Sequence, residues 1–282
     1  MPLTSSPARI HPATLRRAAF LAIATACCTS CDRPPLRWRE AMRTPTAPGA
    51  GWRLAVDAHA KPALGVAATA PFVGPPGACP TSIVFAPAGG GTWFVAWWQP
   101  RADSSAQLMV SRSINGGGSW SAPVAADTRD HAPLGCARPN PAIAADSASG
   151  YVHLAYFIVP RDGAGVWYAH SQDQGATWHA PVGVFYGDDP AHADVAAHGD
   201  TVLVAYEYPN ADDARVGVAV SYTAGHVFAA RMPVSPGTER ASDPRIALGS
   251  GIVAVGWTSG DPAGGRGAAF TVVDVAPLGV GK

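Results

Sequence analysis

The sequence predicts an all-β fold made of repeated four-stranded units, because two short patterns recur together along the chain. The first is an octet with Ser at one end and an aromatic residue at the other. The second is an apolar strand that ends in an aromatic residue. The octets begin 58 and then 50 residues apart, an interval that suits a unit of four strands. The octets are residues 113–120, 171–178 and 221–228. The aromatic-ended strands are residues 94–97, 154–156, 204–206 and 255–257.

Each unit is expected to contain its four strands in the same order. A short apolar strand precedes the aromatic-ended strand, a third strand follows a polar loop, and a Pro-Val pair after the octet begins the fourth. The fourth unit stops after a third strand at 270–274. The early strands at 52–56 and 63–69 are therefore expected to pair with this unit, because an unpaired strand edge is prone to unwanted association.

The octets have the chemistry of tight turns. A short Asp or Asn side chain accepts hydrogen bonds from backbone amides a few residues on, and a glycine adopts a conformation that other residues avoid. The final Trp is then expected to pack into the apolar layer between sheets. The residues predicted to build the turns are Ser113, Asn115, Gly117 and Trp120 in the first octet, and Ser171, Asp173, Gly175 and Trp178 in the second.

The second octet, Ser-Gln-Asp-Gln-Gly-Ala-Thr-Trp, resembles the Asp box (bacterial neuraminidase, or BNR, repeat) of the sialidase superfamily, whose pattern is S-x-D-x-G-x-[ST]-W. The first octet matches nearly as well, and the third keeps only its Ser, Gly and final aromatic residue. The resemblance runs from about residue 79 to the end of the chain. It implies a sialidase-like β-propeller of about four to five four-stranded blades, with an Asp box between the third and fourth strands of a blade.

The first 50 residues are predicted to lie outside the folded domain. Residues 1–26 have the pattern of a signal peptide, with two arginines before an apolar core and an Ala-x-Ala cleavage site. Cys27 follows directly, so the chain is expected to be exported and either lipid-anchored through Cys27 at the cell envelope or secreted. Residues 27–50 are rich in Pro and Arg and are interpreted as a tether. Residues 51–282 form the predicted propeller domain.

Charge is distributed unevenly, although the net charge of the chain is zero. Residues 1–43 hold seven Arg against one Asp and one Glu, and the remainder holds 13 basic against 18 acidic residues. A mildly acidic folded part argues against nucleic acid as a partner. Contact with a membrane is expected only through the lipid anchor.

Cys79 and Cys136 occupy matching places, each just before the first strand of its unit. In an exported protein this arrangement predicts a disulfide between neighbouring units. The alternative is a pair of free thiols.

Polar residues that enter the first strand of each unit form the predicted binding site. Because strand direction alternates, these loops lie at the end of the sheets opposite the octets, and the ligand sites of propellers are usually found at that end. The predicted binding residues are Arg138, Asn140, His192, Asp194, Asp243 and Arg245. The cluster at 188–194 has three interpretations: a calcium site, a proton-transfer site or a solvated rim. The remaining histidines show no zinc-ligand spacing, so neither a metal site nor a cofactor is predicted.

The resemblance to sialidases also implies a set of catalytic candidates. Such an enzyme needs arginines that clamp a sugar carboxylate, a Tyr activated by a Glu as nucleophile, and an Asp as acid and base. The candidates are Arg138, Arg240, Arg245, Asp189, Asp194, Tyr206 and Glu207. Tyr206 and Glu207 are neighbours on one strand, however, and would point to opposite faces.

Two functions from different classes follow. One is a non-catalytic module that binds a glycan or another envelope protein, and the other is a glycoside hydrolase of the exo-sialidase type. The first is favoured for two reasons. Residues 52–282 supply little more than four units, fewer than the six blades of catalytic sialidases. The Arg-Ile-Pro motif that opens those enzymes is also absent before Cys79.

Overall fold

A computed structural model describes residues 36–44, 51–210, 215–260 and 266–274, all within one packed unit that spans residues 34–282. The predicted signal peptide and Cys27 lie outside these residues. Within the described part of the chain, the secondary structure is almost entirely β, with a single 3-10 turn at Pro80–Ser82. No helix there has the length and apolar character needed to span a bilayer.

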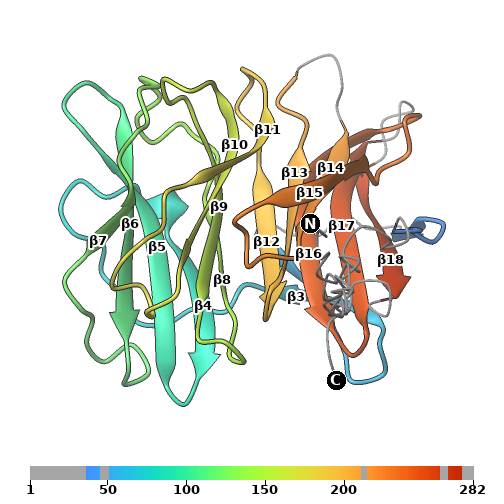
Figure 1. Ribbon diagram of the computed structural model, residues 1–282, viewed down its shortest axis with the longest axis horizontal. Helices are drawn as coiled ribbons and strands as arrows, with labels where there is room; N and C mark the ends of the chain where they lie inside the picture. Colours follow the sequence, from blue (N-terminus) through green and yellow to red (C-terminus); the bar gives the residue numbers. More distant parts are fainter. Residues whose placement is uncertain (1–35, 45–50, 211–214, 261–265, 275–282) are drawn as a thin grey trace, which may run out of the picture. The chain divides into compact units, whose positions relative to one another are not determined.

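Four antiparallel sheets of four strands each follow one another along the chain (Figure 1). The first blade contains β4 (Val84–Gly89), β5 (Thr92–Pro100), β6 (Ala106–Ser113) and β7 (Val124–Asp127). The second contains β8 (Ala142–Ala145), β9 (Val152–Ile158), β10 (Gly165–Ser171) and β11 (Val182–Tyr186). The third contains β12 (Ala193–His198), β13 (Thr201–Glu207), β14 (Val216–Ser221) and β15 (Phe228–Pro233). The fourth contains β16 (Arg240–Gly249), β17 (Ile252–Gly260), β18 (Arg266–Asp274) and β1 (Met42–Thr44).

The first strands of successive blades lie next to one another: β4 contacts β8, β8 contacts β12, and β12 contacts β16. A fifth sheet holds only β2 (Trp52–Val56) and β3 (Pro62–Val66), and β2 contacts β16. Every residue of β9, β10 and β14 is buried, because both faces of these middle strands pack against neighbouring blades. The predicted all-β propeller of about four to five blades is confirmed.

The last strand of the fourth blade differs from the prediction. The hairpin of β2 and β3 was expected to complete this blade, but among the described strands β2 and β3 pair only with each other. The physical reason is local: the carboxylate of Asp57 accepts the amides of His59 and Lys61 and closes the turn between the two strands. The edge of β18 pairs instead with β1, from the segment interpreted as a tether.

The folded domain therefore begins earlier than the predicted boundary at residue 51. Leu36 is buried in the core between the third and fourth blades. Arg43 lies 2.5 Å from the carboxylate of Glu239, which also accepts the indole N–H of Trp257. A three-residue strand that reads Met-Arg-Thr is too short and too polar to stand out as a pattern.

A disulfide joins Cys79 to Cys136, the pairing predicted from their matching places in the first two units. Cys79 is fully buried, and its amide donates to the carbonyl of Trp98 in β5. The bond links the chain entering the first blade to the chain entering the second. It lies at the end of the sheets away from the octets.

The octets connect the third and fourth strands of the first three blades. In the second octet, the hydroxyl of Ser171 donates to Asp173 Oδ1 (2.7 Å) and accepts the amide of Gly175 (2.7 Å). Asp173 Oδ1 also accepts the amide of Thr177 (2.8 Å). The first octet forms the same turn with Asn115, whose Oδ1 accepts from Ser113 Oγ and from the amide of Ser119.

Each octet also packs against the unit that precedes it in the chain. Trp178 is half-buried against the core shared by the first and second blades. Within the described ranges no complete blade precedes the first one. Trp120 instead packs on Phe72 with ring centres 5.2 Å apart and donates its indole N–H to the carbonyl of Pro71 (2.7 Å). The segment around residues 70–73 thus occupies the place of a preceding blade.

Candidate ligand site in the central cavity

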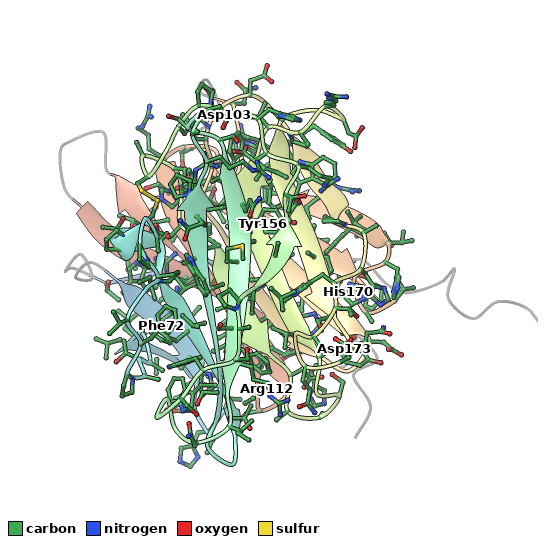
Figure 2. The ribbon with its side chains drawn as sticks, turned by 90° about the vertical axis from the view of Figure 1, so that its left-hand side faces the viewer. Phe72, Asp103, Arg112, Tyr156, His170 and Asp173 are labelled. Atoms are coloured by element: carbon green, nitrogen blue, oxygen red, sulfur yellow. A yellow bond between two sulfur atoms is a disulfide. The ribbon has the colours of Figure 1, made fainter. Side chains whose placement is uncertain are left out.

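The two ends of the blades carry different chemistry. Figure 2 shows Asp103 at one end of the sheets and Arg112 and Asp173 at the other. The octets lie at the Asp173 end, which we call the octet end. The opposite end, where the chain enters each first strand, holds a cavity of about 380 Å³ and is called the cavity end. Polar or charged side chains line it from β2, from β16 and from the segments that enter the first strands of the first three blades: Arg53, Thr81, Asn140, His192, Asp243 and Arg245.

Four of the six predicted binding residues line this cavity, namely Asn140, His192, Asp243 and Arg245. They meet there because first strands that lie side by side and run in the same sense bring their entry loops to one end. The structure does not bring Arg138, Asp189 or Asp194 into the lining. The alternation of strand direction thus predicted which end of the blades holds the cavity, but not every residue that lines it.

Glu207, at the end of β13, ties the third blade to the fourth. Its Oε2 accepts the amide of His192 (2.7 Å) and lies 3.0 Å from the imidazole Nδ1 of the same residue. Its Oε1 accepts the amide of Asp243 (2.6 Å), which sits in a bulge of β16 with a positive φ of 53°. The sequence singled out Glu207 as a catalytic candidate, but both of its carboxylate oxygens accept hydrogen bonds from the protein, one from His192 before β12 and one from Asp243 in β16.

This pairing shifts the pKa values of both His192 and Glu207. The hydrogen bond to Glu207 raises the pKa of His192, although burial opposes that shift. Burial disfavours the Glu207 carboxylate, but hydrogen bonds from His192 and the Asp243 amide outweigh it, so the pKa of Glu207 is lowered. The charged form of each residue is thereby favoured by the other.

Two of the three arginines proposed for a carboxylate clamp, Arg138 and Arg245, are already engaged. The third, Arg240, is exposed at the start of β16 and lies outside the cavity lining. The buried guanidinium of Arg138 pairs with Asp130 (2.8 Å) and donates to the carbonyls of Gly135 and Ala132. Arg245 donates to the carbonyls of Trp52 and Pro244 and pairs with Asp243 (2.7 Å).

Three further catalytic candidates have environments that differ from their expected roles. Tyr206 is fully buried and stacked on Phe185, and burial raises its pKa well above the ordinary value. Its hydroxyl has no hydrogen-bond partner in the part of the chain that the structure describes. It therefore does not pair with Glu207. Asp194 is buried, and its carboxylate accepts the amide of Ile246 in β16 (3.0 Å). Asp189 is exposed in the loop before β12, outside the cavity lining.

Two side chains that line the cavity keep their polar groups available. Among the described residues, neither the guanidinium of Arg53 nor the amide of Asn140 has a hydrogen bond or ion pair. Arg53 lies between the buried residues Trp52 and Leu54 on β2, so strand alternation turns it toward the cavity. Sequence reasoning missed Arg53 because β2 was assigned to the fourth blade, although the alternation around it was a usable signal.

The structure also gathers three histidines that showed no metal-ligand spacing in the sequence. His170, His179 and His226 form the one group of His, Cys, Asp or Glu side chains, within the described ranges, whose ligand atoms lie close enough to share an ion. Burial, together with the neighbouring histidines, lowers the pKa of His170 to about 4. The acidic side chains at 188–194 do not form such a group, so the distances between them give no support to a calcium site there.

Comparison with known proteins gives resemblance in fold at low identity. No protein-family model and no curated protein sequence matches the chain. A protein of unknown function from Dyadobacter fermentans is 17% identical over 65% of this chain and 50% of its own, with a TM-score of 0.46. A Hadza microbial sialidase is 16% identical over 70% of this chain and 46% of its own, with a TM-score of 0.49. A Trypanosoma rangeli sialidase is 11% identical over 68% of this chain and 31% of its own, with a TM-score of 0.42.

The chain thus spans half or less of the length of these three proteins. At such identities and scores, the likeness does not extend to activity or substrate.

Proposed function

We propose that the chain is a non-catalytic binding module that takes a glycan into the cavity end, and that the glycan carries an acidic group. The observation that carries this proposal is that one cavity is lined by the guanidinium of Arg53 and the amide of Asn140, neither of which has a hydrogen-bond or ion-pair partner among the described residues. A guanidinium binds a carboxylate through two parallel hydrogen bonds, and an amide both donates to and accepts from sugar hydroxyls.

The dimensions and charge of the cavity suit such a ligand. Its volume of about 380 Å³ lies in the range of small-molecule sites, which is roughly 300–1,000 Å³. Asp243 offsets the positive charge of Arg245, and Glu207 pairs with His192, whereas Arg53 is a cation of the lining with no carboxylate partner among the described residues. A concave, polar cavity of this volume favours a glycan over the face of an envelope protein.

Hydrolysis of the exo-sialidase type is the alternative, and the geometry argues against it. Arg138 and Arg245 donate to groups of the protein itself. Tyr206 is buried, and no base lies at its hydroxyl among the described residues. The carboxylate of Asp194 accepts a hydrogen bond from a backbone amide. A sialidase would need these groups free to contact the substrate. Catalysis would therefore require different residues or a rearranged cavity.

Binding to a glycan array, followed by titration with the strongest acidic glycan, tests the proposal. We expect Arg53→Ala to weaken binding at least about tenfold, since a charge-assisted hydrogen bond contributes about 1.5–3 kcal/mol. The exposed Arg37 lies outside the cavity, and Arg37→Ala is the matched control. Unchanged affinity of Arg53→Ala, or affinity only for neutral glycans, would contradict the proposal.

A fluorogenic sialyl substrate tests the alternative with the same preparations. Release of the fluorophore by the wild-type chain, and its loss in Arg245→Ala, would show that the chain is a hydrolase and not a non-catalytic binding module. Glycan binding without turnover is the result that the proposal expects.

We also infer that the module is exported and anchored by lipid at Cys27, on the signal-peptide pattern alone. Incorporation of a labelled fatty acid into the expressed chain, and its loss in Cys27→Ser, would support the anchor. A cleaved but unlabelled wild-type chain would instead indicate secretion.

A further inference from the structure

We propose that His170, His179 and His226 bind a zinc ion at the octet end, where the second and third blades meet. The site is separate from the cavity end and independent of the glycan proposal. Zinc suits a set of three imidazole nitrogens, whereas calcium takes oxygen ligands, which this group lacks.

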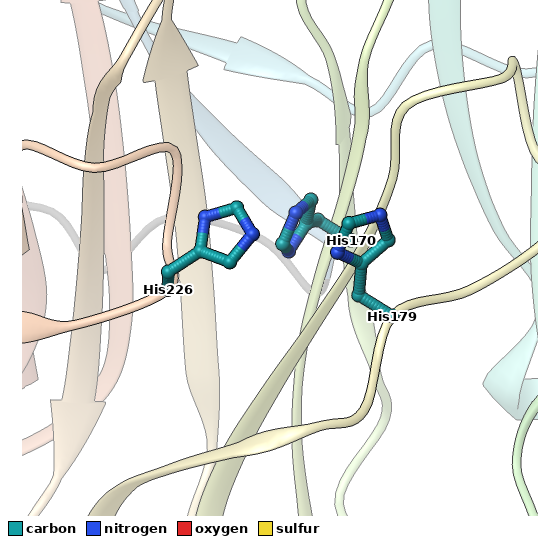
Figure 3. A group of neighbouring side chains, drawn as sticks. All are labelled: His170, His179 and His226. Carbon is teal, nitrogen blue, oxygen red and sulfur yellow. The ribbon is translucent and has the colours of Figure 1, made fainter.

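The three side chains converge from three different elements. His170 lies in β10, His179 follows the second octet, and His226 belongs to the third octet. Figure 3 shows the ring of His170 between the other two. The ring centre of His170 lies 4.4 Å from that of His179 and 4.7 Å from that of His226, and the ligand atoms of all three lie within 4.8 Å of one another.

A second, independent observation points to a ligand. His170 is only 2% exposed, and its buried Nε2 has no hydrogen-bond partner among the residues that the structure describes. A buried polar atom without a partner is destabilising, and such atoms are rare in native proteins. Coordination of an ion held between His170 and the two exposed histidines would satisfy this nitrogen.

The orientation of His226 fits metal binding as well. Its Nδ1 lies 2.6 Å from the carbonyl oxygen of Thr223, so Nδ1–H donates there and Nε2 is the nitrogen left with a lone pair. Histidines that bind metals usually donate their other ring N–H to a carbonyl or carboxylate in this way. The backbone of His179 is fixed by its own amide, which donates to the carbonyl of His170 (3.0 Å).

Closure around an ion requires only a small movement. Zn–N bonds of about 2.0–2.1 Å in a tetrahedron place the nitrogens about 3.4 Å apart. The rings of His179 and His226 are exposed and can turn toward His170, which is held in its strand. Three protein nitrogens leave one coordination position open for water, and the ion would join the second blade to the third octet.

The test uses the untagged full chain, stripped with a chelator and titrated with ZnCl₂ by calorimetry. We expect one zinc ion per chain in the wild type, and affinity lowered at least about 10–100-fold in His179→Gln and in His226→Gln. Both residues are exposed, so neither substitution removes core packing. His59→Gln replaces an exposed histidine outside the group and is the matched control, which should bind like the wild type.

Absorption spectra of the Co²⁺-loaded chain provide a readout of the ligand set. Bands of four-coordinate cobalt in the wild type and in His59→Gln, lost in His226→Gln, would support the site. The proposal is overturned if zinc binds equally well to the wild type, His179→Gln and His226→Gln. It is also overturned if the wild type binds no zinc, or if binding is lost only in His192→Gln, which would place the ion in the cavity.

Discussion

The second and third octets form the same turn with different groups. In both, a fully buried Ser hydroxyl accepts the glycine amide, from Gly175 to Ser171 and from Gly225 to Ser221. The carboxylate of Asp173 has no counterpart in the third octet. There the hydroxyl of Thr223 accepts the amide of Val227 (3.0 Å).

The difference shows which parts of the pattern are structural necessities. The Ser and the Gly make the turn, whereas the acidic residue strengthens it and can be replaced by a weaker acceptor. The third octet also lies closer to its neighbour: a Cβ on Gly225 would lie 2.1 Å from the ring of Tyr168, while one on Gly175 would lie 3.6 Å from Phe94.

Substitution of the two glycines by Ala gives the largest expected difference between the octets. Both have φ near +90°, so each substitution forces Ala into a left-handed conformation that costs about 1–2 kcal/mol. In Gly225→Ala the new methyl group also overpacks against Tyr168, which should cost about 1–3 kcal/mol more of unfolding free energy. The ring of Tyr168 is held in place because its hydroxyl lies 2.6 Å from Nδ1 of His153. Urea unfolding should show Gly225→Ala to be the less stable variant, and equal losses would contradict the packing argument.

Replacement of the two serines tests the part that the octets share. Ser171→Ala and Ser221→Ala each leave two backbone amides without their acceptor, at residues 173 and 175 or 223 and 225. Each variant should lose about 1–3 kcal/mol of unfolding free energy, and the two losses should be similar. A loss confined to Ser171→Ala would show that the third octet does not depend on its Ser.

The smallest expected effect is on the stability of the folded protein at acid pH, through Asp173. A hydrogen bond from the Thr177 hydroxyl, together with others, lowers the pKa of Asp173 from 3.8 to about 2. The contribution of the carboxylate to stability is thus fully present above pH 3.8 and is lost as pH falls through about 2. Melting temperatures should favour the wild type over Asp173→Asn near neutral pH, and the difference should shrink toward pH 2.

The first octet already uses Asn115 in the same position, so Asp173→Asn should fold. A difference in melting temperature that stays constant down to pH 2 would exclude titration of Asp173 as its cause.

Much of the architecture was predictable because it repeats. The octets and the aromatic-ended strands gave four units, and alternation of strand direction located the cavity end and four of its residues. The strand β1 was not predictable, since Met42–Thr44 has neither length nor apolar pattern and pairs across more than two hundred positions with β18. Tertiary pairing, not local propensity, makes it a strand.

Two predicted site residues lie outside the cavity lining because their charged groups are bound by other parts of the fold. Arg138 and Asp194 lie near the entry loops in sequence, but Asp130 and the amide of Ile246 hold them inside the fold. The group of His170, His179 and His226 was not predicted, because its members come from separate parts of the chain. His170 and His226 lie far apart in the sequence, and only the packing of the third octet on the second blade brings them together.

The location of an acidic glycan in a crystal structure of its complex tests the central claim most directly. We expect the acidic group to lie against the guanidinium of Arg53 and a sugar hydroxyl to lie at the amide of Asn140. A glycan bound elsewhere on the surface, with the lining of the cavity unchanged, would contradict it.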